Sequence, residues 1–247
     1  MESHRLSIAM VADCLQPNWR SVLEWAQDDS ILAATPCPPS TGYLYSWFID
    51  TAGTPRPIDL PEDFRHVRES RVDRDVWPDP TYDPRRVYLD ASYNCELCGR
   101  EQLDDPNEGS CQCLVDIINA TPVAVQVFET AHMGMGIRAL QAFRSNKILG
   151  EFVGIVGMAD DDIDVLRSST HGGKYQICQR REGNWTRYIN HACDSNAAVT
   201  KYLWRGIERM VVMVREDAQV AFGEEITVHY GNSYWAGKQC LCSSCLR

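Results

Sequence analysis

The residues most able to do chemistry lie together at 187–196, which reads Arg-Tyr-Ile-Asn-His-Ala-Cys-Asp-Ser-Asn. Two amides, an imidazole and a thiol fall in this short segment, and each can bond a ligand or a metal ion. A polar turn that caps a helix would use similar residue types. The density of ligand groups favours a binding segment over a cap or a piece of core.

Two clusters of cysteines have spacings that suit a metal ion. The first cluster has the pattern C-x2-C-x12-C-x-C, and the second has the pattern C-x-C-x2-C near residue 245. Such close sulfurs do not easily form mutual disulfides, whereas four thiolates can close a tetrahedral zinc site. The alternatives are small buried core cysteines or, for the first pair, a redox dithiol. The first cluster therefore predicts one zinc site, formed by Cys95, Cys98, Cys111 and Cys113.

A pair of glycines, Gly134 and Gly136, follows an apolar run at 123–128. Glycine lets the backbone approach a ligand closely because no Cβ stands in the way. A dinucleotide-binding turn would need a third glycine and a following helix. Position 139 is Ala139, and the sequence around it has strand character, so that type of site is excluded.

The composition limits the class of protein and its partners. The chain has 247 residues, of which 44% are hydrophobic, so it can bury a core as one large domain or two small ones. Its formal charge of −10 disfavours direct nucleic-acid binding and suits a basic, lysine-containing partner. Because its cysteines are clustered, we expect a reducing compartment. No apolar run approaches the ~20 residues needed to cross a bilayer, so we expect no membrane association.

The elements around these residues have mainly strand character. We expect strands at 43–49, 123–128, 148–156, 175–178, 199–204, 209–214 and 226–230, and one early helix at 18–26. Recurrent prolines between residues 53 and 84 indicate an extended chain that wraps the surface. No long helix separates the later strands, so the fold class is a mainly antiparallel β architecture rather than a βαβ fold.

The motifs occur in an order that resembles the SET-domain protein lysine methyltransferases over about residues 93–247. The stretch 134–139 is similar to that family's Gly-x-Gly with Arg-Ala, and 151–154 is similar to its Glu-Tyr-x-Gly. The stretch 183–193 is similar to Gly-Asn-x-x-Arg-Phe-Ile-Asn-His-Ser-Cys, and 223–231 to Gly-Glu-Glu-Leu-Thr-Phe-Asp-Tyr-Gly. The last cysteines resemble a post-SET tail.

This resemblance implies short antiparallel sheets with a threaded, pseudoknot-like carboxy-terminal segment and zinc-tied flanks. It divides the chain into four parts. These are an extension at 1–90, a reduced pre-SET-like cysteine segment at 91–121, a SET domain at 122–232 and a tail at 233–247. It also implies a second zinc site, in which the thiol after the Asn-His pair joins the tail, so that two zinc ions bind per chain. The ligands of this second site are Cys193, Cys240, Cys242 and Cys245.

The activity that the resemblance implies is S-adenosylmethionine-dependent methylation of a protein lysine, with a histone tail as substrate and a nuclear location. Tyr230 is the expected catalytic tyrosine, and Tyr175 is either a second one or a core residue. Arg187 is expected to be tied to a neighbouring carboxylate or to touch the cofactor. A non-histone substrate and a catalytically silent peptide-binding scaffold are the alternatives. The residues assigned to the cofactor are Met133, Gly134, Met135, Gly136, Phe152, Arg187, Asn190, His191 and Tyr230.

Overall fold

The computed structural model describes residues 47–87, 93–95, 98–102, 113, 123–159, 165–170, 173–204, 206–235 and 237–246. The expected helix at 18–26 and the side chain of Cys111 lie outside these residues. Within them, none of the helices has the length and apolar character needed to cross a membrane.

Short β-strands make up most of the fold, as the sequence predicts, and the expectation of a mainly β architecture is confirmed. The strands are β1 (Trp47–Ile49), β2 (Pro55–Pro57), β3 (Arg65–His66), β4 (Arg71–Val72), β5 (Tyr93–Asn94), β6 (Glu101–Gln102), β7 (Val125–Glu129), β8 (Met135–Ala139), β9 (Ile148–Glu151), β10 (Ile155–Met158), β11 (Val165–Thr170), β12 (Gly173–Cys178), β13 (Glu182–Gly183), β14 (Asn190–His191), β15 (Ala197–Trp204), β16 (Ile207–Val214) and β17 (Glu225–Val228). The described residues also form two short 3-10 helices, η2 (Trp185–Tyr188) and η3 (Asn232–Trp235).

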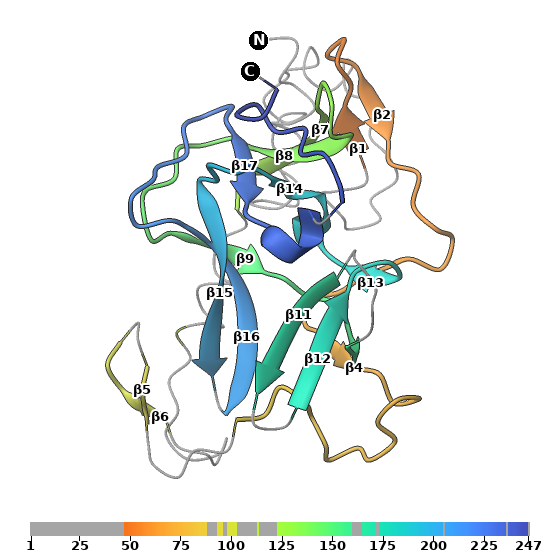
Figure 1. Ribbon diagram of the computed structural model, residues 1–247, viewed down its shortest axis with the longest axis vertical. Helices are drawn as coiled ribbons and strands as arrows, with labels where there is room; N and C mark the ends of the chain where they lie inside the picture. The colour runs from red at the N-terminus through yellow and green to blue at the C-terminus, as the bar shows by residue number, and fades with distance from the viewer. Residues whose placement is uncertain are drawn as a thin grey trace, which may run out of the picture.

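The largest sheet has six strands in the order β14-β17-β8-β7-β1-β2. Strand β17 lies between β14, its parallel partner, and β8, its antiparallel partner. Two smaller sheets have the orders β11-β12-β10-β4 and β15-β16-β9. In the view of Figure 1 the six-stranded sheet and η3 occupy the upper part, and the hairpins β11–β12 and β15–β16 occupy the lower part. The strand β17, which comes late in the sequence, thus lies between two strands that come earlier in the sequence.

The segment 47–72, which the sequence assigns to an N-terminal extension, adds strands to the sheets of the later residues. Strand β1 pairs with β7, β3 with β13 and β4 with β10, each time in parallel. Strand β2, which carries Pro55 and Pro57, lies at the edge of the six-stranded sheet. Proline is tolerated there because an edge strand has ladder positions that need no N–H donor. The proline-rich chain therefore wraps the domain through edge pairing.

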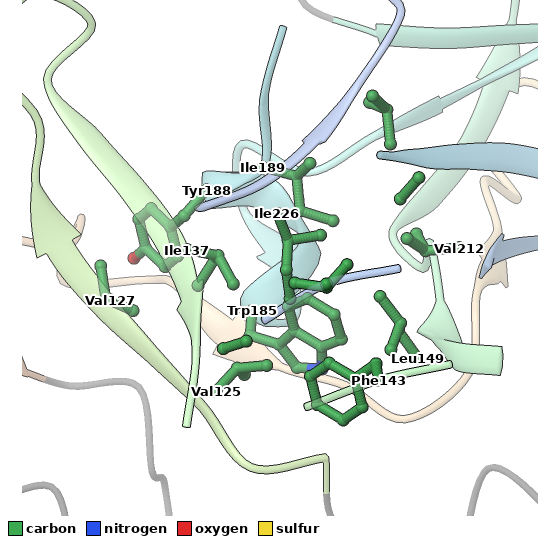
Figure 2. Packing of buried hydrophobic residues seen from close by; sticks show 14 of the residues in the cluster. Val125, Val127, Ile137, Phe143, Leu149, Trp185, Tyr188, Ile189, Val212 and Ile226 are labelled. Carbon is green, nitrogen blue, oxygen red and sulfur yellow. The ribbon is translucent and has the colours of Figure 1, made fainter. Parts of the chain in front are cut away.

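The main core lies against the six-stranded sheet and includes both aromatic residues of η2. Trp185 and Tyr188 are buried there among β-branched and aliphatic side chains, with the Trp185 indole beside Phe143 and Leu149 in Figure 2. An added Cβ at Gly150 would lie 3.0 Å from Cζ2 of Trp185, so glycine gives the indole its space. This packing fixes η2, and with it the start of the Asn190–His191 strand. The other labelled core residues in Figure 2 are Val125, Val127, Ile137, Ile189, Val212 and Ile226.

Candidate active site and metal centres

The six-stranded sheet brings three separate sequence motifs to one place. Asn190 of β14 is paired with Thr227 of β17, and Ile226 of β17 is paired with Ile137 of β8. Gly136 on β8, the Asn-His pair on β14, and β17, the strand that leads to Tyr230, are therefore side by side, although they are far apart in sequence.

The two glycines are needed for different reasons. Gly134 has φ +71°, a left-handed conformation that closes the turn onto β8, and its carbonyl accepts hydrogen bonds from both the backbone N–H and the hydroxyl of Thr130. Gly136 has no such φ, but an added Cβ would lie 2.6 Å from Oε1 of Glu225 and 3.0 Å from Nδ2 of Asn190. Gly136 therefore lets two polar side chains lie directly against the backbone of β8.

The amide of Asn190 is oriented by two acceptors. Its Nδ2 donates to the carbonyl of Met135 at 3.1 Å and to Oε1 of Glu225 at 3.0 Å. A carbonyl and a carboxylate oxygen can only accept from this amide, so the NH2 group must face them. No donor in the described part of the chain bonds to Oδ1 of Asn190. That oxygen is therefore available to accept a hydrogen bond from a ligand.

His191 holds the backbone of Tyr230 in place. It is 2% exposed, and its Nδ1 accepts from the Tyr230 N–H at 3.1 Å, which leaves a proton of the neutral ring on Nε2. Burial, helped by the neighbouring His229, lowers the pKa of His191 and favours the neutral ring. Its ring also contacts Trp235 of η3, with centroids 4.6 Å apart.

Tyr230 is held by its hydroxyl, and the residue is partly exposed to solvent. Its hydroxyl donates a short hydrogen bond to the carbonyl of Ile189, and the residue is 38% exposed. Tyr234 packs edge-on against its ring at 4.8 Å. Lys238 places its ammonium 4.0 Å from the centre of the Tyr234 ring, so this aromatic surface accommodates a cation.

Other residues assigned from the sequence lie in different surroundings. Tyr175 is fully buried in a second cluster with Val156 and Ile177, and partly buried Phe152 packs against that cluster. The Tyr175 hydroxyl donates to Oε1 of Glu208 at 2.6 Å, and burial together with this carboxylate raises the pKa of the phenol. The core interpretation of Tyr175 is consistent with this position, and the catalytic role stays a prediction.

Arg187 contacts aromatic rings where a carboxylate was expected. Its guanidinium lies 4.4 Å from the centre of the Phe64 ring and 5.4 Å from that of Tyr188. Burial lowers its pKa, and its Nη1 is buried without a hydrogen-bond partner among the described residues. Arg187 thereby ties η2 to the segment just before β3.

The tail cysteines converge with Cys193 as the resemblance implies. The four sulfurs of Cys193, Cys240, Cys242 and Cys245 all lie within 4.8 Å of one another, and none is in a disulfide. Burial opposes ionisation of Cys242, but backbone N–H groups and the Cys240 thiol outweigh it and lower its pKa to about 6. Hydrogen bonds to its neighbours, Cys245 first, raise the pKa of Cys193 to about 12. Four convergent sulfurs, one of them with a lowered pKa, fit a tetrahedral zinc site.

The first cysteine cluster is partly described. The sulfurs of Cys95, Cys98 and Cys113 lie within 4.8 Å of one another, and Cys111 lies outside the described residues. Three convergent thiols fit a second zinc site, to which Cys111 would add the fourth ligand.

Glu225 is a member of the site that sequence reasoning missed. It stands in the Gly-Glu-Glu motif, but nothing in the sequence shows that its carboxylate meets Asn190. The motif was the only sequence signal, and it was weak, because a charged residue directly before an apolar strand is usually exposed to solvent.

Comparisons with known proteins agree with this geometry. Residues 134–231 match the family model of the SET domain. A "SET domain-containing protein" of Phaeosphaeria nodorum is 34% identical over 99% of this chain and 42% of its own length. Histone-lysine N-methyltransferase EHMT1 of Homo sapiens is 28% identical over 51% of this chain and 11% of its own length. The chain thus spans less than half the length of either relative.

A solved structure shows a similar fold. The "Neurospora SET domain protein DIM-5, a histone lysine methyltransferase" matches with a TM-score of 0.50 and 15% sequence identity. The match covers 75% of this chain and 95% of that chain.

Proposed function

Since residues 134–231 of this chain form a SET domain, we propose that it transfers a methyl group from S-adenosylmethionine to the side-chain amine of a lysine in another protein. The observation that carries the proposal is that Gly136 on β8, the Asn190–His191 pair on β14, and Tyr230, which follows β17, meet through three adjacent strands. The relatives named above as histone-lysine N-methyltransferases support the same activity.

The residues present fit such a methyl donor. Gly136 lets the side chains of Glu225 and Asn190 lie against the backbone of β8, Asn190 offers a free oxygen, and the neutral His191 holds the Tyr230 backbone. When bound, S-adenosylmethionine would supply an electrophilic methyl group attached to a positively charged sulfur. Met133, Gly134, Met135 and Arg187 complete the proposed binding set, and Phe152 belongs to it only by resemblance.

The proposed role of Tyr230 is to orient the lysine amine. A free lysine has a pKa of about 10.4, so its neutral form must be favoured locally before the nitrogen can attack. A narrow apolar channel that excludes water and a nearby positive charge would both disfavour the ammonium. The phenol then needs only to hold the amine in line, which is positioning and electrostatic catalysis.

We propose a basic segment, such as a histone tail, as the substrate, and the nucleus as the location. The formal charge of −10 suits such a partner, and the matched relatives include histone methyltransferases. The cysteine segment at 91–121 and the tail at 233–247 are proposed to bind one zinc ion each and to brace the domain between them.

The proposal is tested by incubating the zinc-loaded chain with isotope-labelled S-adenosylmethionine, a histone panel and a cell extract. Mass spectrometry then locates the label. Labelled histone lysine is the expected result. Label confined to another protein would replace the histone by a non-histone substrate. Binding of the donor with no label in any protein would favour the silent scaffold.

A further inference from the structure

The carboxylate of Glu225 lies inside the proposed donor site. Its Oε1 accepts from Nδ2 of Asn190 at 3.0 Å and lies 2.6 Å from the position that a Cβ on Gly136 would take. It is therefore in contact with two of the groups that form the site, although it begins β17 and is only partly buried.

No cation in the described part of the chain pairs with this carboxylate. Arg138 stands directly opposite Glu225 on β8, where cross-strand neighbours share one face of the sheet. Arg138 instead donates to Oε1 of Gln126 at 2.7 Å and lies 5.3 Å from the centre of the Phe128 ring. On β14, His191 accepts at Nδ1 from the Tyr230 N–H, so its ring carries no charge. The adjacent carboxylate, Glu224, accepts from Asn196 and from the Ala221 N–H.

The ionised carboxylate of Glu225 is therefore energetically unfavourable in the folded protein. Burial raises the pKa of Glu225 above its usual value, and the hydrogen bond from Asn190 offsets this only in part. A carboxylate that is partly desolvated and lacks a cationic partner becomes more stable when a cation is placed beside it.

We propose that Glu225 is a positioning and specificity residue, which orients the Asn190 amide and supplies the charge that selects a cationic methyl donor. This inference rests on the proposed function and names how that same site distinguishes donor from product. The reaction moves the methyl carbon from sulfur to nitrogen, and the electron pair of the broken C–S bond stays on sulfur. The donor is thus a sulfonium cation, and its product is a neutral thioether at that atom. Glu225 favours the former and assists release of the latter.

The decisive variant is Glu225→Gln, which keeps the shape and leaves an oxygen to accept from Asn190. Full-length, zinc-loaded wild type and variant are titrated calorimetrically with S-adenosylmethionine and, separately, with S-adenosylhomocysteine. We expect Glu225→Gln to weaken the donor by about tenfold and the neutral product by much less. Glu224→Gln is the matched control, and we expect both affinities to be unchanged.

The second readout is the stability of the unliganded protein. Because the folded pKa of Glu225 is raised, the folded state binds more protons than the unfolded state between the ordinary pKa and the raised one. Wild-type stability therefore falls as pH rises through that window, and the carboxylate disfavours folding above it. We expect Glu225→Gln to melt at the same temperature as wild type or higher at pH 7, and to lose this part of the pH dependence.

Equal losses of affinity for the two ligands, or a lower melting temperature for Glu225→Gln, would show a merely structural role and overturn the inference. If Glu225→Gln weakens binding of the donor much more than binding of the product, but wild type transfers no methyl group, the proposed function fails and the inference about Glu225 stands. If wild type binds neither ligand, both fail.

Discussion

At the scale of single residues, the candidate site is held in place by hydrogen bonds within the protein. Asn190 is oriented by Met135 and Glu225, and Tyr230 is held at its N–H by His191 and at its hydroxyl by Ile189. Groups fixed in this way need little reorganisation when charge moves during a reaction. A ligand would thus meet a preorganised surface.

Replacing Tyr230 by phenylalanine tests the proposed orientation of the amine. The change removes one hydroxyl and keeps the ring, so we expect methyl transfer to slow by at least about 100-fold. Donor affinity should change by less than about twofold, because the phenol acts on the amine. Tyr202→Phe is the control, since Tyr202 lies on β15, outside the proposed site, with its hydroxyl 3.8 Å from the sulfur of Met213. Single-turnover rates with labelled donor decide the matter, and an unchanged rate would remove Tyr230 from catalysis.

Gly136→Ala tests the close packing at the glycine pair. The new methyl group would lie 2.6 Å from Oε1 of Glu225 and 2.8 Å from Cγ2 of Thr130, so neighbouring groups must move. We expect a loss of about 1–3 kcal/mol in the free energy of unfolding, and weaker donor binding. Gly157→Ala is the matched control, because nothing lies within 4 Å of its added Cβ. Urea unfolding measures both variants, and equal stability of the two would contradict the packing at Gly136.

At the scale of elements, β17 is the strand on which the site depends. It pairs with β14 on one side and β8 on the other, so it brings the Asn-His pair to the glycine pair and leads directly into Tyr230. Its residues Ile226 and Val228 are buried in the main core. Burial of these apolar side chains stabilises the inserted strand, while the polar residues at its ends form the site.

The segment 47–87 is a second element with a structural task. Besides its three parallel pairings, it places Phe64 under the guanidinium of Arg187. We expect Phe64→Ala to lower the free energy of unfolding by about 2–3 kcal/mol, because the half-buried Arg187 cation loses its ring and a side chain loses its packing. Phe222→Ala, at a side chain 61% exposed, should cost less than about 0.5 kcal/mol. Chemical denaturation followed by tryptophan fluorescence would contradict the contact if the two variants were alike.

Several elements could be predicted from local pattern, and their partners could not. Strands β7, β12, β15, β16 and β17 fall within or close to the expected ranges because their apolar residues are concentrated and bounded by turns. The single strand expected at 148–156 is wrong, since the chain leaves β9 at Phe152 and starts β10 at Ile155. Gly154 permits this change of sheet, as an added Cβ would lie 2.4 Å from the Cys178 carbonyl oxygen.

In the site, too, the residue types could be predicted from the local sequence, whereas the contacts between distant residues could not. The Asn-His pair, the glycine pair and Tyr230 stand out by residue type and by resemblance. The contact between Glu225 and Asn190, and the position of Arg187 over Phe64, depend on pairings between distant strands. A hydrophobic pattern indicates which face of a strand is buried, but it does not identify the neighbouring strand.

At the scale of the whole molecule, the second cysteine cluster connects the carboxy-terminal end of the described chain to the β domain. The tail cluster includes Cys193, which lies two residues after the buried His191, and its sulfur is 3.5 Å from Nε2 of that ring. A metal ion bound by this cluster would therefore fix the tail beside the candidate site.

Metal analysis tests both clusters. We expect two zinc ions per chain, one after Cys242→Ser, and two after the control Cys178→Ser, since Cys178 lies outside the clusters. Because thiolates must protonate as pH falls, zinc should dissociate on acidification, and chelation should lower stability and donor affinity together. Elemental mass spectrometry of the purified chain gives the count, and a value of zero would reject both sites.

We propose that the site formed by Gly136, Asn190 and Tyr230 binds S-adenosylmethionine. Calorimetric titration of the purified, zinc-loaded chain with this compound tests it most directly, with Asn190→Ala as the variant that removes the free amide oxygen. We expect saturable binding of one donor per chain, weakened by about tenfold or more in Asn190→Ala. Absence of binding to the wild-type chain, or equal affinity of the two proteins, would contradict it.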